Sequence, residues 1–170
     1  VIRVGFSGGE GTADGKYLRS VLEVSGTIIV EDSLYLGVGT RLCVSGTLHV
    51  NSMTSTSRLH LVCMDKITVG KNVLIGWDCL FMDTDFHRLT RVDGKPVKGF
   101  GPITIGKNTW IANGCRIMKN TSVPDYSVIA AYTVLTGKVD APSKSVIGNE
   151  HNSKVLANRR WLDSENMTII

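Results

Sequence analysis

The sequence predicts an all-β protein built as a solenoid of six-residue repeats, and periodicity and composition both favour this fold. Aliphatic residues recur at every sixth position through much of the second half of the chain, at Ile105, Ile111, Ile117, Val123, Ile129 and Leu135. A strict period of six fits neither a helix nor a simple strand, but it fits stacked coils in which each hexad is a short strand and a corner. Aromatic residues make up only 6% of the chain, and the many Val, Ile and Thr residues suit thin β layers.

The same register is visible further upstream, where Val69, Ile75 and Phe81 begin three consecutive hexads. Small or turn-forming residues follow the leading aliphatic residue at fixed offsets: Gly70, Gly76, Gly106, Asn72 and Asn108. Glycine and asparagine tolerate tight or left-handed backbone, so these positions are the expected corners of the coils.

Outside these regular stretches the repeat is weaker, and the points where it weakens or stops divide the chain into three predicted parts. Residues 1–17 are predicted to be a loose lead-in, and 18–140 the solenoid domain. Within it, 18–50 forms degenerate coils whose aliphatic residues fit two registers equally well, and the polar stretch 51–58 is expected to be an irregular corner or loop. Residues 141–170 are expected to form a tail, because Pro142 ends the repeat, and 150–170 within it a short helix or an extended arm.

One long interruption separates the two regular stretches. Three hexads make one coil, so 69–86 completes a coil and the next begins at Ile105. The intervening segment contains Asp-Gly, Lys-Pro and Gly-Pro pairs, which are turn formers. We therefore expect a loop over about 88–102 that protrudes from the solenoid wall, and loops on rigid scaffolds often carry function.

The residues that could carry chemistry stand where this loop begins. His87 follows Asp83 and Asp85 in the segment M-D-T-D-F-H. In an extended chain, alternate residues lie on one face, so two carboxylates and an imidazole are predicted to converge. Such an arrangement orients a histidine and raises its basicity, as a general base requires.

Four segments together resemble the hexapeptide-repeat acyltransferases, specifically the maltose/galactoside-type sugar O-acetyltransferases and their relatives in polysaccharide biosynthesis. They are K-I-T-V-G-K-N-V-L-I-G, M-D-T-D-F-H with the D-G loop after it, G-P-I-T-I-G-K-N-T-W-I-A, and A-A-Y-T-V-L-T. The resemblance covers about residues 62–156. It implies a left-handed parallel β-helix that assembles as a homotrimer, with acetyl-CoA bound between neighbouring subunits.

The resemblance also implies roles for individual residues. His87 matches the catalytic base, which takes the proton from an acceptor hydroxyl. Asp83 and Asp85 are the carboxylates expected to orient it. A backbone N–H near Asn113 would serve the thioester carbonyl. Trp110 matches a residue near the reaction centre, although an aromatic side chain packed on a neighbouring subunit would explain it equally well. The other positions implied to contact acetyl-CoA are Ala131, Thr136, Lys138 and Lys154, with Lys138 standing in for a basic residue of the family where this chain has Gly137.

The function that follows is acetyl transfer from acetyl-CoA to a hydroxyl of a sugar or sugar-derived acceptor through a direct ternary complex, with no metal. The alternative is N-acetylation of an amino sugar or nucleotide-linked amino sugar, because an amine and a hydroxyl need the same base. A zinc-dependent hydratase on the same fold would need three histidines, two of them close together, and the four in this chain do not show that spacing. A binding or structural solenoid without catalysis is a third class.

The sequence says less about the identity of the acceptor than about the type of reaction. Four basic residues in the loop suggest a phosphorylated or nucleotide-linked acceptor, although a solvated loop face explains them as well: Arg88, Arg91, Lys95 and Lys98. The net charge of +4 is mild, and neither a nucleic acid nor a membrane is expected as a partner.

The chain is expected to be cytoplasmic, since it shows neither an apolar run of about 18 residues nor a secretory signal. Its four cysteines contain no C-x-x-C pair. Cys79 and Cys115 fall at the same position of their hexads and are predicted to stack on successive coils as reduced, space-filling residues.

Overall fold

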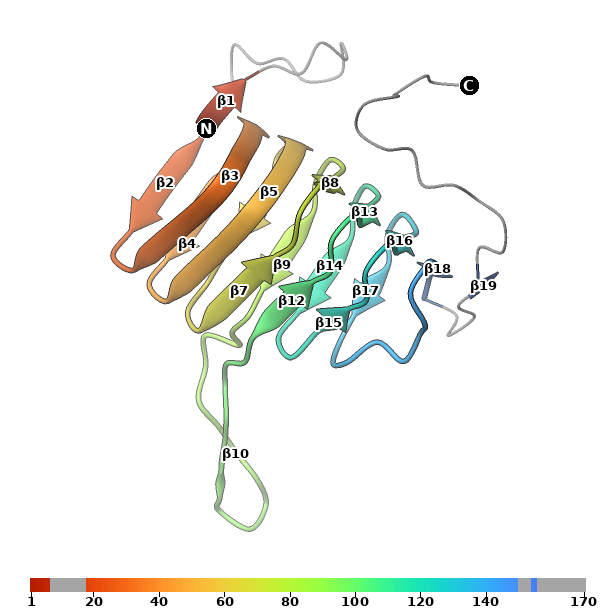
Figure 1. The fold of residues 1–170 in the computed structure, drawn as a ribbon. Coiled ribbons are helices and arrows are strands. Elements are labelled where there is room, and N and C mark those ends of the chain that lie inside the picture. Colours follow the sequence, from red (N-terminus) through yellow and green to blue (C-terminus); the bar gives the residue numbers. More distant parts are fainter. Residues whose placement is uncertain (7–17, 150–153, 156–170) are drawn as a thin grey trace.

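The structure is a computed structural model that describes residues 1–6, 18–149 and 154–155. Within these residues the chain forms strands, turns and bends but no helix, and none of it could cross a membrane as an apolar helix. Parallel strands stack side by side into a solenoid, as Figure 1 shows. The predicted all-β parallel solenoid is therefore confirmed, while its left-handed sense stays a prediction.

Each coil contributes one short strand to the first face of the solenoid. These strands pair in parallel and in this order along the face: β2 (Val21–Val24), β4 (Arg41–Val44), β6 (His60–Leu61), β9 (Leu80–Met82), β14 (Arg116–Met118) and β17 (Val134–Leu135). Because the six strands are in sequence order, the chain winds in one direction from end to end.

The other two faces are separate only in the later coils. The second face holds β7 (Lys66–Val69), β12 (Ile103–Ile105) and β15 (Ser122–Val123), and the third holds β8 (Val73–Ile75), β13 (Trp110–Ile111), β16 (Val128–Ile129) and β18 (Ser145–Ile147). In the early coils a single long strand spans both faces, namely β3 (Thr27–Val38) and β5 (Thr47–Ser57). The beginning of β5 pairs with β7 and its second half with β8.

Two predictions about the N-terminal part are wrong. Residues 51–57 belong to the continuous strand β5 and do not form a loop, because small Ser and Thr side chains alternate between the interior and the surface there. Ser55 and Ser57 are buried, for example, whereas Thr54 and Thr56 are partly exposed. In addition, β1 (Ile2–Phe6), inside the expected lead-in, pairs in parallel with β3.

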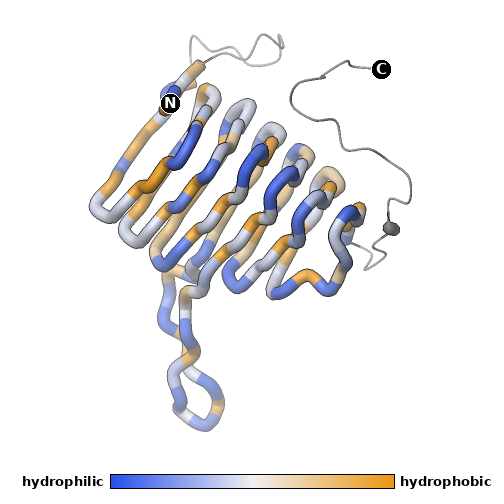
Figure 2. The backbone as a smooth tube through the Cα atoms, in the orientation of Figure 1, coloured by the Kyte–Doolittle hydropathy of each residue, from blue (hydrophilic) through white to orange (hydrophobic). Residues whose placement is uncertain are grey.

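The core is a set of aliphatic columns that run along the solenoid axis. All six residues of the period-six run are at most 8% exposed, which confirms that the repeat marks the interior. From Leu36 onward both registers that fit residues 18–50 point inward, since Leu36 and Leu42 are buried and so are Val38 and Val44, whereas Val24 in the first coil is 47% exposed. Figure 2 shows the resulting alternation of hydrophobic and hydrophilic residues along the coils.

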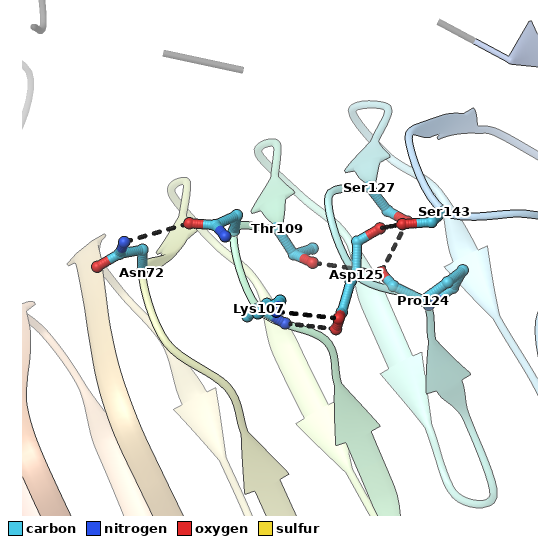
Figure 3. A network of polar contacts seen from close by, with 8 residues as sticks. Asn72, Lys107, Thr109, Pro124, Asp125, Ser127 and Ser143 are labelled. Carbon is cyan, nitrogen blue, oxygen red and sulfur yellow. Dashed lines mark hydrogen bonds and ion pairs between the residues drawn. The ribbon is translucent and has the colours of Figure 1, made fainter. Parts of the chain in front are cut away.

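The corner between the second and third faces combines left-handed backbone with close packing. Asn72 and Asn108 have φ of 56° and 52°, as predicted, and the Asn72 amide donates to Asn108 Oδ1 at 3.2 Å. Gly70 and Gly106 are required for a different reason. Their φ angles are not positive, but a Cβ at Gly106 would lie 2.5 Å from the backbone nitrogen of Asp125 on the next coil. The polar contacts along this corner, including those of Lys107 with the Asp125 carboxylate, appear in Figure 3.

The two stacked cysteines behave as predicted. Cys79 and Cys115 are buried and free, on strand neighbours in register. The Cys79 thiol donates to the carbonyl of Ala112 at 3.1 Å, and the Cys115 thiol to that of Ala130 at 3.2 Å. The neighbouring Cys115 thiol, together with burial, raises the pKa of the Cys79 thiol. Both side chains therefore act as small interior donors.

The C-terminal end extends the solenoid beyond its predicted limit. β18 (Ser145–Ile147) pairs in parallel with β16, so the repeat continues past Asp140 to Ile147. The short strand β19 (Lys154–Val155) then pairs antiparallel with β18. The rest of the expected tail lies outside the described residues.

Candidate functional site

A hairpin leaves the solenoid between the first and second faces of the fourth coil, after β9 and before β12. It contains β10 (Leu89–Thr90) paired antiparallel with β11 (Pro96–Val97). An antiparallel bridge between Thr84 and Phe100 closes its base. Figure 1 shows it projecting from one edge of the solenoid. The predicted protruding loop is thus confirmed, but its base begins at Thr84 and it is a paired hairpin.

Asp83 forms the root of this hairpin and is completely buried. Its carboxylate accepts hydrogen bonds from the backbone nitrogens of Met64 at 3.0 Å and Asp65 at 2.8 Å. At the equivalent corner one coil earlier, the backbone nitrogens of Ser45 and Gly46 bind a backbone carbonyl, that of Cys63. The carbonyl of Asp83 is turned instead to Gly101 N. The Asp83 side chain therefore replaces the main-chain acceptor that the coil loses where the hairpin departs.

Asp85 holds the hairpin against the following coil. Its carboxylate lies 2.6 Å from the Nζ of Lys119 on the next coil, and both side chains are about a quarter exposed. Lys119 also donates to the backbone carbonyl of Lys98 on the opposite strand of the hairpin, at 3.1 Å. One ammonium group thus ties both strands of the hairpin to the solenoid, with hydrogen bonds strengthened by its charge.

His87 is exposed, and a backbone contact fixes its tautomer. Its Nδ1 lies 3.0 Å from the carbonyl oxygen of Asp85. A carbonyl oxygen can only accept, so in the neutral imidazole Nδ1 carries the proton and Nε2 the lone pair. Nε2 has no hydrogen-bond partner among the described residues. The imidazole is therefore oriented with its basic nitrogen free to take a proton from a ligand.

The predicted convergence of the two carboxylates with His87 is wrong in detail. The chain is not a plain extended strand here, because Phe86 has a left-handed φ of 58° and the alternation of faces fails. The Asp83 carboxylate points to the preceding coil and that of Asp85 to Lys119. The imidazole is hydrogen-bonded to the main-chain carbonyl of Asp85. The two carboxylates instead form hydrogen bonds that hold the base of the hairpin in place.

The residues predicted to contact acetyl-CoA separate into two groups. Trp110 lies on the third face, 41% exposed, and Asn113 and Ala131 follow at or near the corner between the third and first faces. The N–H of Asn113 has no acceptor among the described residues. Thr136 and Lys138 directly follow β17, the last strand of the first face. There they line a pocket with Val139 and Gly148. Lys154 lies in β19, and its side chain is outside the described part.

Within one chain, His87 and Trp110 are therefore on different sides of the solenoid. His87 belongs to the edge between the first and second faces, and Trp110 points outward from the third face. Trp110 lies in a column of outward aliphatic residues on successive coils, namely Leu74, Val128 and Val146. A single chain does not bring these two predicted site residues together.

Sequence inspection missed two residues of this site. Lys119 was not distinguishable because its partner lies 34 residues away, across the hairpin. Phe86 was overlooked because a left-handed backbone is not expected of a bulky residue. Its position directly before His87, in a segment without a glycine, was the only available signal.

The fold and this site define a hexapeptide-type parallel β-solenoid that carries a histidine at the root of a hairpin. No protein-family model matches the chain. It is 29% identical over 93 residues to an uncharacterized 24.8 kDa protein in the cps region of Klebsiella pneumoniae. That match covers 55% of this chain and 39% of the relative, so the chain spans about two fifths of the relative's length. Among solved structures, the chain is similar to the polySia-specific acetyltransferase NeuO, with 15% identity, a TM-score of 0.45 and 87% of each chain covered.

Proposed function

We propose that this protein is an acetyltransferase that moves an acetyl group from acetyl-CoA to a hydroxyl of a sugar in a polysaccharide or its precursors. The observation that carries the proposal is the geometry of His87, whose Nδ1–H is fixed by the Asp85 carbonyl at 3.0 Å. This leaves an exposed, basic Nε2 at the root of a hairpin on a rigid scaffold, which is where a general base is useful.

The proposed reaction is a direct transfer. Nε2 of His87 takes the proton of the acceptor hydroxyl while the oxygen attacks the thioester carbon of acetyl-CoA. The negative charge that develops on the thioester oxygen needs a hydrogen-bond donor, and the free N–H of Asn113 is suited to this role. Collapse of the tetrahedral species breaks the carbon–sulfur bond, and the thiolate of CoA recovers the proton from His87.

A complete site requires a second copy of the chain, because His87 and Asn113 lie on different edges of one solenoid. We infer a homotrimer in which His87 of one subunit meets Trp110 and Asn113 of its neighbour. The outward column on the third face supports the assembly, because Leu74 and Trp110 are exposed and Val128 and Val146 partly exposed. Apolar side chains that reach the surface in a row mark an interaction surface. The same assembly would bring Thr136 and Lys138 to the CoA substrate.

A sugar acceptor is supported by the genomic setting of the Klebsiella pneumoniae relative, a cps region. The free thiols among the described residues and the use of acetyl-CoA favour the cytoplasm as the place of reaction.

The test of the base is the substitution His87→Ala. We expect acetyl transfer to fall about 10²–10⁴-fold, because a positioned general base contributes that much, with binding of acetyl-CoA retained. Near-normal turnover would refute the role of His87. Mixing His87→Ala with Trp110→Ala subunits before reassembly then tests the shared site, since mixed trimers should regain part of the activity that each variant lacks alone.

The acceptor is identified by following CoA release with a panel of free sugars, nucleotide sugars, amino sugars and capsular oligosaccharides. We expect turnover with a hydroxyl acceptor. Preferential acetylation of an amino group would replace the proposed reaction by N-acetylation. Failure of the wild-type protein to bind acetyl-CoA in calorimetry would exclude both.

A further inference from the structure

Phe86, directly before His87, combines features that structural packing does not explain. Its backbone is left-handed, with φ of 58°, a region that costs an L-residue with a bulky side chain conformational free energy. Its side chain is nevertheless 60% exposed, so burial of the ring returns little of this cost. A strained residue without a structural return is a candidate for a functional contact.

Two other aromatic residues have a left-handed backbone, and there the repeat accounts for it. One of them, Tyr132, is 72% exposed, so what sets Phe86 apart is its place outside the repeat. Tyr126 and Tyr132 occupy corners where every coil turns and where neighbouring coils place Asn108 and Gly114 in the same conformation. The Tyr132 ring lies against Gly114, where an added Cβ would be 2.5 Å from it, and Tyr126 has the Lys107 ammonium 5.7 Å from its ring. Phe86 lies outside the repeat, so no neighbouring coil imposes its conformation.

The second aromatic residue at the base of the hairpin does not offer the same free surface. Phe100 lies on the opposite strand, and the Nζ of Lys98 sits 4.7 Å from the centre of its ring. Among the described residues, the Phe86 ring has neither an aromatic nor a cationic partner. The exposed aromatic surface available beside the candidate base is therefore that of Phe86.

We propose that Phe86 is a binding residue for the acceptor and that its ring packs against the apolar C–H face of the acceptor sugar. An exposed aromatic ring provides apolar area with few degrees of freedom to lose, which suits a polar ring that has one C–H face. Consecutive Cα atoms are about 3.8 Å apart, so a sugar on this ring lies within reach of His87. This inference rests on the proposed function and names the residue that holds its acceptor.

The left-handed conformation allows a substitution that removes the ring without harming the fold. Asparagine occupies this region at Asn72, Asn108 and Asn120, so Phe86→Asn should keep the backbone and relieve its strain. We expect the KM for the acceptor to rise about tenfold, with the KM for acetyl-CoA unchanged and a midpoint of thermal unfolding no lower than that of the wild type. Phe86→Trp should restore the acceptor KM.

Val92→Asn is the matched control, because Val92 is a fully exposed apolar residue elsewhere on the same hairpin and its loss should change neither KM. An unchanged acceptor KM in Phe86→Asn, or a clearly lower unfolding midpoint, would overturn the role of Phe86 while the proposed function stands. Absence of turnover by the wild type with every sugar of the panel would instead overturn the proposed function, and this inference with it.

Discussion

The two halves of the solenoid solve the same packing problem in different ways. In the N-terminal half, β3 and β5 are strands of 12 and 11 residues that run across two faces without a break. In the C-terminal half, the same two faces are built from strands of two or three residues separated by a corner at Gly106 and Asn108. The later coils are also shorter, since Ile111 pairs with Ile129 whereas Thr27 pairs with Thr47.

The difference lies in what fills the interior. On the third face, successive coils place Leu36, Ser55, Ile75, Ile111, Ile129 and Ile147 in one inward column. The regular half uses an isoleucine at each level, and the N-terminal half admits a serine that is 0% exposed. In the regular half this column is therefore purely aliphatic, whereas in the N-terminal half the same fold tolerates a buried serine in it.

Substitution of one column residue should show how much the regular half depends on this purity. We expect Ile111→Ser to lower the free energy of unfolding by about 4 kcal/mol. The substitution removes most of a buried aliphatic side chain and places a hydroxyl group in the interior, where water cannot hydrogen-bond to it. Urea denaturation followed by circular dichroism measures the loss. Val134→Ser is the control, since Val134 points outward on the first face, outside the column of Leu74 and Trp110, and is 52% exposed. Equal costs for the two variants would contradict the distinction between inward and outward columns.

The regular half was predictable from the sequence because its hexads determine both the interior positions and the asparagine corners. The strand over 51–57 was not predictable, because Ser and Thr are common in loops. Their alternation between the interior and the surface, which identifies the strand, is visible only in the structure. Handedness is not contained in the period at all. The hairpin could be located by counting coils, since a rigid repeat makes any insertion conspicuous.

The root of the hairpin differs from the regular coils, because here a side chain replaces a main-chain acceptor. We expect Asp83→Ala to lower the free energy of unfolding by about 3 kcal/mol, since the backbone nitrogens of Met64 and Asp65 lose their partners. Asp93→Ala, on the exposed hairpin, should cost less than about 0.5 kcal/mol. Thermal unfolding distinguishes them. A stable Asp83→Ala protein with lost activity would instead make Asp83 a direct participant in catalysis.

The site could be predicted only in part. His87 is a candidate because it stands where the repeat stops, but the partners of Asp83 and Asp85 depend on which neighbouring coil each side chain meets. Residues such as Met64 and Lys119 come from other coils, and no local spacing in M-D-T-D-F-H encodes them. The separation of Trp110 from His87 follows from the count of faces between them, which the sequence alone left open.

The smallest effect, and the one of opposite sign, belongs to two buried serines from the two halves. Ser55 has no hydrogen-bond partner among the described residues, whereas Ser127 donates to the carbonyl of Pro124 at 2.8 Å. Ser55→Ala removes an unpaired buried hydroxyl, so we expect the free energy of unfolding to rise by about 1 kcal/mol. Ser127→Ala removes a satisfied one and should lower it by about 1 kcal/mol. If the urea midpoints of both variants shifted in the same direction, the buried hydroxyl of Ser55 would be as well hydrogen-bonded as that of Ser127, and the difference between the two halves would not hold.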